Sequence, residues 1–244
     1  MNDVRLIRSG DELYEALPGD LLVRQIAVRW AEHLPAYAYG RAVGLFHAWD
    51  DNPDLVVMGD PDDALVLARA FRAELPDRTQ HLSLPRVAGE RLAREEGLPV
   101  REGWAFRWTA TPPVLPVTGA EWLPPAADDE VRGVLTAGFP DASMPVGHPS
   151  VRRWAGLRRD GALVAVAADT TGVPGLGFLA SITTLPEARG TGAGAAVTAW
   201  ATAELVQEEG VCALWLMAGN HVAAALYTRL GYADEHQMAS IGHV

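Results

Sequence analysis

A strand, a proline and three glycines in the second half of the chain have the residue types of an anion site. Residues 179–194 read Leu-Ala-Ser-Ile-Thr-Thr-Leu-Pro-Glu-Ala-Arg-Gly-Thr-Gly-Ala-Gly. The β-branched and apolar stretch 181–185 predicts a strand, which Pro186 ends because proline cannot donate to a β-ladder. The alternate glycines of residues 190–194 then allow a tight turn into an Ala-rich helix. The first amides of a helix lack internal partners and lie at the positive end of its dipole, so this segment predicts a phosphate site.

Three phosphate-binding patterns compete for this segment. A P-loop ends in Gly-Lys-Ser/Thr, and the chain contains no lysine. A dinucleotide-binding turn is matched loosely by the first two glycines and Ala195, but the next predicted strand, Val211 to Met217, is not followed by the expected acidic residue. The third pattern, Arg-x-x-Gly-x-Gly, is formed by Arg189, Gly192 and Gly194.

A second motif follows at a suitable distance. Residues 220–232 read Asn-His-Val-Ala-Ala-Ala-Leu-Tyr-Thr-Arg-Leu-Gly-Tyr. Asn220 is a favourable helix N-cap, Gly231 suits a helix C-terminus, and Tyr227 lies two turns after Asn220 on nearly the same side. Together the two motifs resemble the pyrophosphate loop and the closing motif of the GCN5-related N-acetyltransferases, the GNAT family. The resemblance covers roughly residues 120–244.

The resemblance implies an enzyme that transfers an acetyl group from acetyl-CoA, its co-substrate, to a primary amine of a small molecule or peptide. We expect no metal. The residues that the resemblance assigns to the cofactor are Ile182, Thr183, Thr184, Arg189, Gly190, Thr191, Gly192, Ala193, Gly194 and Asn220. Tyr227 is expected to be the general acid that protonates the departing thiolate. The alternative is a catalytically idle, CoA-binding sensor or interaction protein with the same fold.

The expected contacts follow from backbone chemistry. Amides of residues 190–194 would hold the pyrophosphate, with charge-assisted support from Arg189. The backbone of Ile182 and Thr184 would pair with the pantetheine arm like an added strand. An amide near Thr183 or Thr184 would polarise the thioester carbonyl.

The acceptor side is less defined by the sequence. The Pro-rich segment 139–149 has the position of acceptor loops in the family, which makes Asp141, Ser143, Met144 and His148 candidate substrate contacts; a plain connection is the alternative. An amine must lose a proton before it attacks. Asp141 and Asp169 are the candidates for a base that acts through water.

Charge and composition limit the function classes. The formal net charge of −11 argues against nucleic-acid binding, and it serves either solubility or the attraction of a cationic substrate. No apolar run reaches the length of a membrane span and no signal-peptide pattern is present, so we expect a cytoplasmic monomer or homodimer with no membrane partner. The single cysteine, Cys212, lies in an apolar strand and is expected to be inert. The seven histidines show no metal-ligand spacing.

The element order predicts an α/β fold, with a central mixed β-sheet flanked by helices in each of two tandem acetyltransferase-like lobes. Residues 1–112 are expected to form a degenerate lobe without a cofactor site, and residues 113–244 the catalytic domain. In the first lobe the strand-to-helix turn reads Gly-Asp-Pro-Asp-Asp over residues 59–63, and its three carboxylates would repel a pyrophosphate.

Four local expectations complete the prediction. Residues 21–30 are compatible with a strand or a helix, and residues 51–54, Asp-Asn-Pro-Asp, predict a turn. The strands before and after the Ala-rich helix should be parallel neighbours. Residues 234–244 could form a closing strand.

Overall fold

The computed structural model describes residues 4–27, 36–49, 52–74, 81–115 and 119–242. The chain divides into two compact units. The first contains residues 1–106, 216–220 and 236–244, and the second contains residues 107–215 and 221–235. The sequence-based boundary between residues 112 and 113 stays a prediction.

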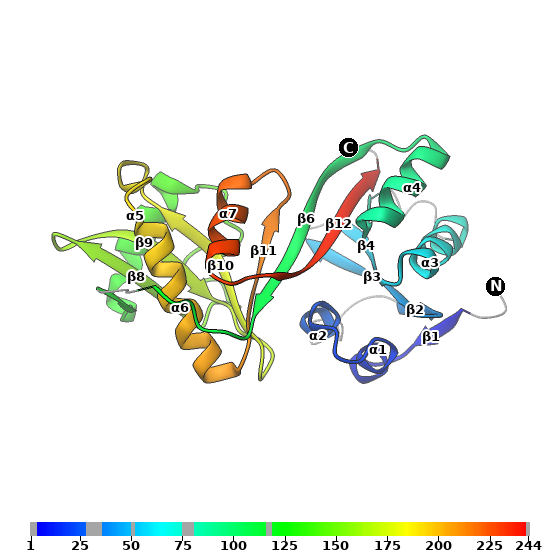
Figure 1. Ribbon diagram of the computed structural model, residues 1–244, viewed down its shortest axis with the longest axis horizontal. Helices are drawn as coiled ribbons and strands as arrows, with labels where there is room; N and C mark the ends of the chain where they lie inside the picture. Colours follow the sequence, from blue (N-terminus) through cyan, green and yellow to red (C-terminus); the bar gives the residue numbers. More distant parts are fainter. Residues whose placement is uncertain (1–3, 28–35, 50–51, 75–80, 116–118, 243–244) are drawn as a thin grey trace. The chain divides into compact units, whose positions relative to one another are not determined.

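The first unit is built on a mixed sheet (Figure 1). Its strands lie in the order β1 (Arg5–Ile7), β2 (Ala36–Tyr39), β3 (Ala42–Trp49), β4 (Asn52–Gly59), β5 (His81–Pro85), β12 (Asp234–Gly242) and β6 (Val100–Thr109), of which β6 and β12 extend past the unit's limits. Its helices are α1 (Gly10–Ala16), α2 (Leu21–Ala27), α3 (Pro61–Glu74) and α4 (Arg86–Glu96). Strands β4 and β5 are parallel because α3 connects them, whereas β12 runs antiparallel to β5.

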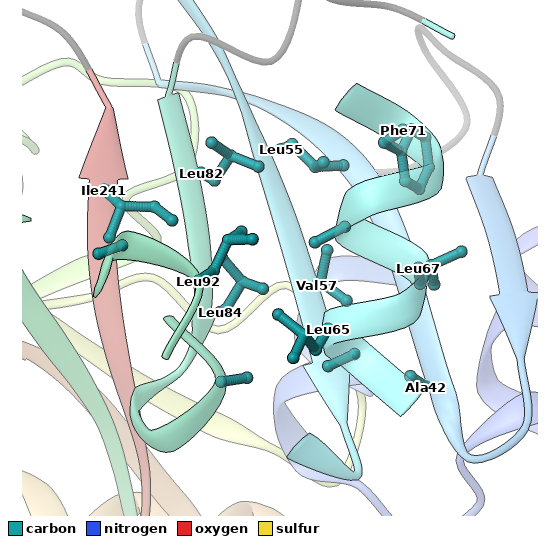
Figure 2. Close-up of a cluster of buried hydrophobic side chains, with 14 of the residues drawn as sticks. Ala42, Leu55, Val57, Leu65, Leu67, Phe71, Leu82, Leu84, Leu92 and Ile241 are labelled. Carbon is teal, nitrogen blue, oxygen red and sulfur yellow. The ribbon is translucent and has the colours of Figure 1, made fainter. Parts of the chain in front are cut away.

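Helices α3 and α4 cover one face of this sheet. Leu55 and Val57 of β4 lie in one buried cluster with Leu67 of α3, and Leu82 and Leu84 of β5 complete the cluster (Figure 2). Residues of β4 that alternate with these, Val56 and Met58, are also buried. A strand that is apolar on both sides fits its central position in the sheet.

The second unit has its own strand order, β11 (Cys212–Met217), β10 (Gly177–Thr184), β9 (Ala162–Asp169), β8 (Arg153–Arg159) and β7 (Ala120–Trp122). Its α-helices are α5 (Asp128–Gly138), α6 (Ala193–Glu209) and α7 (His221–Arg229), and its short 3₁₀ turns are η3 (Pro125–Ala127) and η4 (Pro186–Ala188). Strands β10 and β11 are parallel, as expected for the strands that α6 connects.

Helices cover both faces of the second sheet. Val166 and Ala168 of β9 pack in the cluster that α5 contributes to. Ala165 and Ala167 alternate with them, are equally buried, and lie on the face where α6 packs. Helix α6 carries small side chains over much of its length, which lets it approach the sheet closely. The predicted α/β class with mixed sheets is therefore confirmed.

The local expectations have mixed outcomes. Residues 21–27 form the helix α2, whereas residues 28–30 lie outside the described part of the chain. The turn predicted over residues 51–54 is wrong for its last three residues, because Asn52 already pairs with Trp49 in a long β3–β4 ladder; Asp51 is not described. Residues 234–242 form the predicted closing strand, β12.

Candidate active site

Strand β10 contains a β-bulge near its centre. Ala180 pairs with Ala168 of β9, and the next pair joins Thr183 to Val166, so β10 carries one extra residue. Ser181 takes up the irregularity with a left-handed φ of 47°, a strained conformation for a residue with a side chain. Bulges redirect a strand, and this one changes the course of β10 just before the predicted cofactor residues.

Beyond the bulge, β10 no longer pairs with β11. The register of the two strands covers only Gly177–Leu179 against Cys212–Leu214 in the described part of the chain. Because the Leu185 amide donates to Val164 of β9 at 2.9 Å, the alternation of a strand turns the amides of Ile182 and Thr184 away from β9. Their backbone polar groups therefore point to the side on which β11 no longer pairs with β10, where the Thr184 carbonyl accepts a bond from Arg189 at 3.4 Å.

The glycine loop follows directly. Gly190 and Gly192 have left-handed φ angles of 74° and 85°, and a methyl group at either would meet nothing within 4 Å. Gly194 differs, since a Cβ there would lie 2.7 Å from the Thr184 hydroxyl, so the start of α6 rests against the end of β10. The amide of Ala196 is bonded to the Gly192 carbonyl, and the amides before it receive no partner from the first turn of the helix. The loop thus presents backbone donors at the positive end of a 17-residue helix.

The guanidinium of Arg189 is bonded to two backbone carbonyls. It donates to the Gly138 carbonyl at 2.7 Å and to the Thr184 carbonyl at 3.4 Å. A Cβ at Gly138 would lie 2.7 Å from the Thr183 side chain, so the end of α5 packs tightly against β10 at this point. The side chain of Arg189 therefore joins α5, β10 and the loop. Its contribution to a pyrophosphate stays a prediction.

Tyr227 lies on α7 with its side chain almost fully buried. Its exposed fraction is 7%, and burial raises the pKa of its phenol to about 12. Within the described residues the hydroxyl has no hydrogen-bond partner. The centroids of the Tyr227 and Tyr232 rings lie 5.8 Å apart. A phenol with this pKa is neutral at physiological pH, so it has a proton to donate.

Helix α7 is held at both ends. It begins at His221, immediately after Asn220, whose backbone amide donates to Met217. Gly231 ends it with a left-handed φ of 89°, and the Tyr232 amide bonds back to the Tyr227 carbonyl at 3.0 Å. Arg107 also donates to the Ala224 carbonyl at 3.1 Å. These contacts fix the rotation of α7 and hence the direction of the Tyr227 side chain.

A second buried tyrosine stands in contrast to Tyr227. The hydroxyl of Tyr232 lies 2.8 Å from the Thr202 hydroxyl and 3.1 Å from the Cys212 sulfur. Burial raises the pKa of Tyr232 well above its usual value. With its hydroxyl engaged on both sides, Tyr232 joins α6 to β11 as part of the core.

Cys212 is expected to be chemically silent in the folded protein. Its thiol is fully buried, and burial raises its pKa from 9.0 to about 12. Because the thiolate is the reactive form, we expect no reaction with Ellman's reagent near pH 8 under native conditions. Concentrated guanidinium chloride should release the one thiol of each chain. Rapid labelling of the native protein would contradict this prediction.

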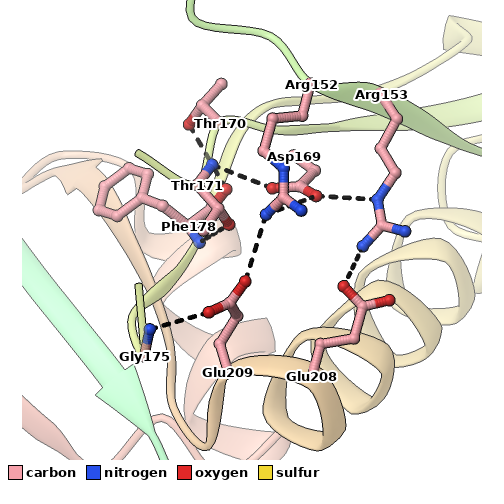
Figure 3. Close-up of polar contacts among 9 residues, drawn as sticks. All are labelled: Arg152, Arg153, Asp169, Thr170, Thr171, Gly175, Phe178, Glu208 and Glu209. Carbon is pink, nitrogen blue, oxygen red and sulfur yellow. Dashed lines mark hydrogen bonds and ion pairs between the residues drawn. The ribbon is translucent and has the colours of Figure 1, made fainter. Parts of the chain in front are cut away.

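Asp169 is not placed to act as a base. Its carboxylate is fully buried and accepts hydrogen bonds from Arg153 at 2.9 Å and from the Thr171 amide at 3.0 Å, while Arg152 lies 3.8 Å away (Figure 3). Asp169 also lies opposite Leu179, at the other end of β10 from Thr184. The expectation for Asp169 is therefore wrong, because this carboxylate is a structural ion partner.

The ion network around Asp169 should be important for stability. Asp169→Asn removes the negative charge between Arg152 and Arg153, and we expect it to lower the free energy of unfolding by about 3 kcal/mol. This value is at the lower end for a broken buried ion pair, because both arginines are partly exposed. Urea denaturation measures this loss. The control is Asp129→Asn, which breaks the exposed pair with Arg132 and should cost less than about 0.5 kcal/mol. Equal losses in the two variants would show that the buried network has no special role.

The predicted acceptor loop is joined to the bulge of β10. The Met144 amide donates to the Ser181 hydroxyl at 3.0 Å. Within the loop, the Nδ1 atom of His148 accepts a hydrogen bond from the Ser150 amide at 3.1 Å, so this ring nitrogen already has a partner. Asp141 and Ser143 are exposed. The structure thus brings Met144 close to the strand that carries Ile182 and Thr184, while the roles of all four loop residues stay predictions.

The corresponding turn in the first unit has the opposite electrostatics. The carboxylate of Asp60 accepts from the amides of Asp62 and Asp63 at the start of α3. Arg41 forms an ion pair with Asp60 at 2.6 Å, and its own amide donates to Asp63. The chain's own carboxylates therefore satisfy donors that, in the second unit, stay open.

One contact of the glycine loop is not indicated by the sequence motifs. Arg159, at the end of β8, donates to the hydroxyl and the carbonyl of Thr191 at 2.6 and 2.9 Å. Asp160 and Gly161 form the turn between β8 and β9, and nothing in their types indicates which segment lies beside it. Only the register of the sheet places the turn of the β8–β9 hairpin beside the glycine loop.

In the described ranges, no group of three or more His, Cys, Asp or Glu side chains could hold a metal ion. Among the helices of the same ranges, none combines the length and the apolar character needed to cross a bilayer.

Comparison with known proteins supports the fold. The family model described as FR47-like protein matches residues 155–240. A GCN5-related N-acetyltransferase from Kribbella flavida is 25% identical, with a TM-score of 0.57 over 82% of this chain and 86% of that chain. A GCN5-related N-acetyltransferase from Sphaerobacter thermophilus is 12% identical, with a TM-score of 0.64 over 98% and 94% of the two chains. A search of curated proteins gave no significant match.

These findings support a class of protein. The match of residues 155–240 to the FR47-like family model and the likeness to GCN5-related N-acetyltransferases support a GNAT-family protein, as the two motifs of the second half predicted. A tandem GNAT protein from the clavulanic acid biosynthesis pathway, 14% identical with a TM-score of 0.53, covers 98% of this chain and 98% of its own length. That likeness concerns the fold alone and confirms two acetyltransferase-like lobes. The fold supports an acyltransferase-type function.

Proposed function

We propose that this protein transfers an acetyl group from acetyl-CoA to a primary amine of a small molecule or peptide by direct attack of the amine. The observation that carries the proposal is the departure of β10 from β11 after the bulge at Ser181, directly before a loop with two left-handed glycines at the start of α6. An open strand edge followed by unpaired amides suits one extended ligand that ends in phosphates.

The predicted cofactor residues would divide the binding of acetyl-CoA among them. The amides of residues 190–194 hold the diphosphate, including Thr191 and Ala193 between the glycines. Ile182 and Thr184 bond the pantetheine arm through the backbone. Since the Thr183 amide faces β9, the Thr184 amide is the better placed of the two to stabilise the oxyanion that forms on the thioester. Asn220 fixes the start of α7.

Tyr227 would act as the general acid. Its phenol keeps its proton at neutral pH and has no competing acceptor among the described residues. Proton transfer to the sulfur as the C–S bond breaks prevents the release of an unstabilised thiolate. The amine attacks the thioester carbon and loses its proton to water or to a base, for which Asp141 stays the candidate.

The two lobes would have different tasks. We propose that residues 113–244 form the catalytic domain and that residues 1–112 have no cofactor site, supported by the way Asp60 caps the first amides of α3. A pyrophosphate at that turn would meet three carboxylates at once.

A free-thiol assay tests the proposed function. Purified protein is incubated with acetyl-CoA and a panel of polyamines, aminoglycosides and amino acids, and the CoA thiol released is measured. Thiol release that depends on an amine and on Tyr227 supports the enzyme. Binding of CoA in calorimetry without release on any amine would favour the idle sensor, and no binding of CoA would reject both.

A further inference from the structure

The β8–β9 hairpin brings a positive charge to the glycine loop. Arg159 is the last residue of β8 and pairs with Ala162 at the start of β9. Ala165 of β9 lies opposite Thr184, the last residue of β10. Because the two strands are antiparallel, the start of β9 extends past the end of β10, to the level where the glycine loop begins.

The contact between Arg159 and the loop is bidentate. One guanidinium nitrogen donates to the Thr191 hydroxyl at 2.6 Å and another donates to the Thr191 carbonyl at 2.9 Å. The same hydroxyl donates its proton to the Ala188 carbonyl at 2.6 Å. Thr191 stands between the two left-handed glycines, so these three bonds hold the residue on which the orientation of the neighbouring amides depends.

The charge of Arg159 has no carboxylate partner among the described residues. Other arginines of the second unit pair with acids, as Arg153 does with Asp169 and Arg158 does with Glu130. The acceptors of Arg159 and of Arg189 are neutral. In a chain with a net charge of −11, two guanidiniums bonded to neutral acceptors next to open amides leave a local positive potential.

We propose that Arg159 is a positioning residue of the cofactor loop and that its charge strengthens binding of the diphosphate of CoA; this inference rests on the proposed function. Arg159 orients the loop amides through Thr191, and an anion held by those amides lies next to an uncompensated guanidinium. Both effects act on affinity and neither acts on the chemical step, so Arg159 governs the affinity for CoA and not the turnover at saturation.

Calorimetry of CoA and dephospho-CoA binding tests the inference. Arg159→Gln should raise the Kd of both ligands by about tenfold, because both contain the diphosphate, and should make binding less sensitive to salt. Arg159→Lys keeps the positive charge but loses the planar pair of donors that bonds Thr191. This variant should bind both ligands more weakly than the wild type while retaining the salt dependence of binding. The kcat at saturating acetyl-CoA should change less than about twofold in either variant.

Arg158→Gln is the matched control. The neighbouring Arg158 pairs with Glu130 and has no bond to the loop, so its variant should bind CoA like the wild type. The inference is overturned if Arg159→Gln binds CoA normally, if Arg158→Gln loses as much affinity, or if the loss is confined to CoA and absent for dephospho-CoA, which would place the charge at the 3′-phosphate. Thermal unfolding of each variant identifies a loss of affinity caused by misfolding. A wild-type protein that binds neither ligand would reject the proposed function itself.

Discussion

Gly192→Glu is expected to weaken CoA binding by at least about 100-fold, because a carboxylate would stand next to the amides that hold the diphosphate. Gly192 has a φ of 85° and open space where a side chain would project. The substituted side chain therefore meets no protein atom, but it brings a negative charge to the position proposed for an anion. Calorimetry with CoA measures the effect directly and does not require the acceptor to be known.

The chain supplies a matched control for this variant at the other end of the same helix. Gly210 has a φ of 82°, is equally open, and ends α6. Gly210→Glu introduces the same charge with the same backbone strain, about 1 to 2 kcal/mol, and we expect it to lower stability without changing the Kd for CoA. Unchanged CoA affinity in Gly192→Glu would reject the proposed position of the diphosphate. A similar loss in both variants would point to a general effect on α6.

Tyr227→Phe should lower kcat by about 100-fold and change the KM for acetyl-CoA little, since only the proton donor is removed. The substitution deletes a hydroxyl that bonds to no described residue, so the fold should keep its stability. Steady-state kinetics with any amine that releases thiol measures the effect. Because burial raises the pKa of Tyr227 to about 12, the phenol stays protonated as the pH rises, and its ionisation should begin to lower the rate only as the pH approaches that value.

Tyr232→Phe separates chemistry from packing. It removes a buried hydroxyl that contacts Thr202 and Cys212, and it should cost about 1 to 2 kcal/mol of stability while kcat stays within about twofold of the wild type. We thus expect Tyr227→Phe to change kcat but not stability, and Tyr232→Phe to change stability but not kcat. A Tyr227→Phe variant with normal kcat would remove Tyr227 from the mechanism.

Acceptor contacts and the general base were the least predictable parts of the site. Asp169 had the right residue type, but its carboxylate is surrounded by Arg152, Arg153 and the Thr171 amide. The sequence separation of 16 residues between Arg153 and Asp169 gave no sign of the pair. An ion pair across neighbouring strands depends on the register of the sheet, which no local pattern specifies.

The sequence by itself determined the features that depend on neighbouring residues. Left-handed turns need glycine, and positions 190, 192 and 231 have it; a helix that begins after Asn220 carries Tyr227 two turns later because the helical period is constant. The parallel pairing of β10 and β11 followed from the helix between them.

Only the tertiary structure decided what lies next to these elements. The bulge at Ser181 and the parting of β10 from β11 arise from the pairing of whole strands. Arg189 finds its acceptor 51 residues away in Gly138, and Arg159 finds its own 32 residues away in Thr191. Backbone conformation is set by local sterics, whereas the partner of a charged side chain is set by which segments the packed sheet and helices bring together.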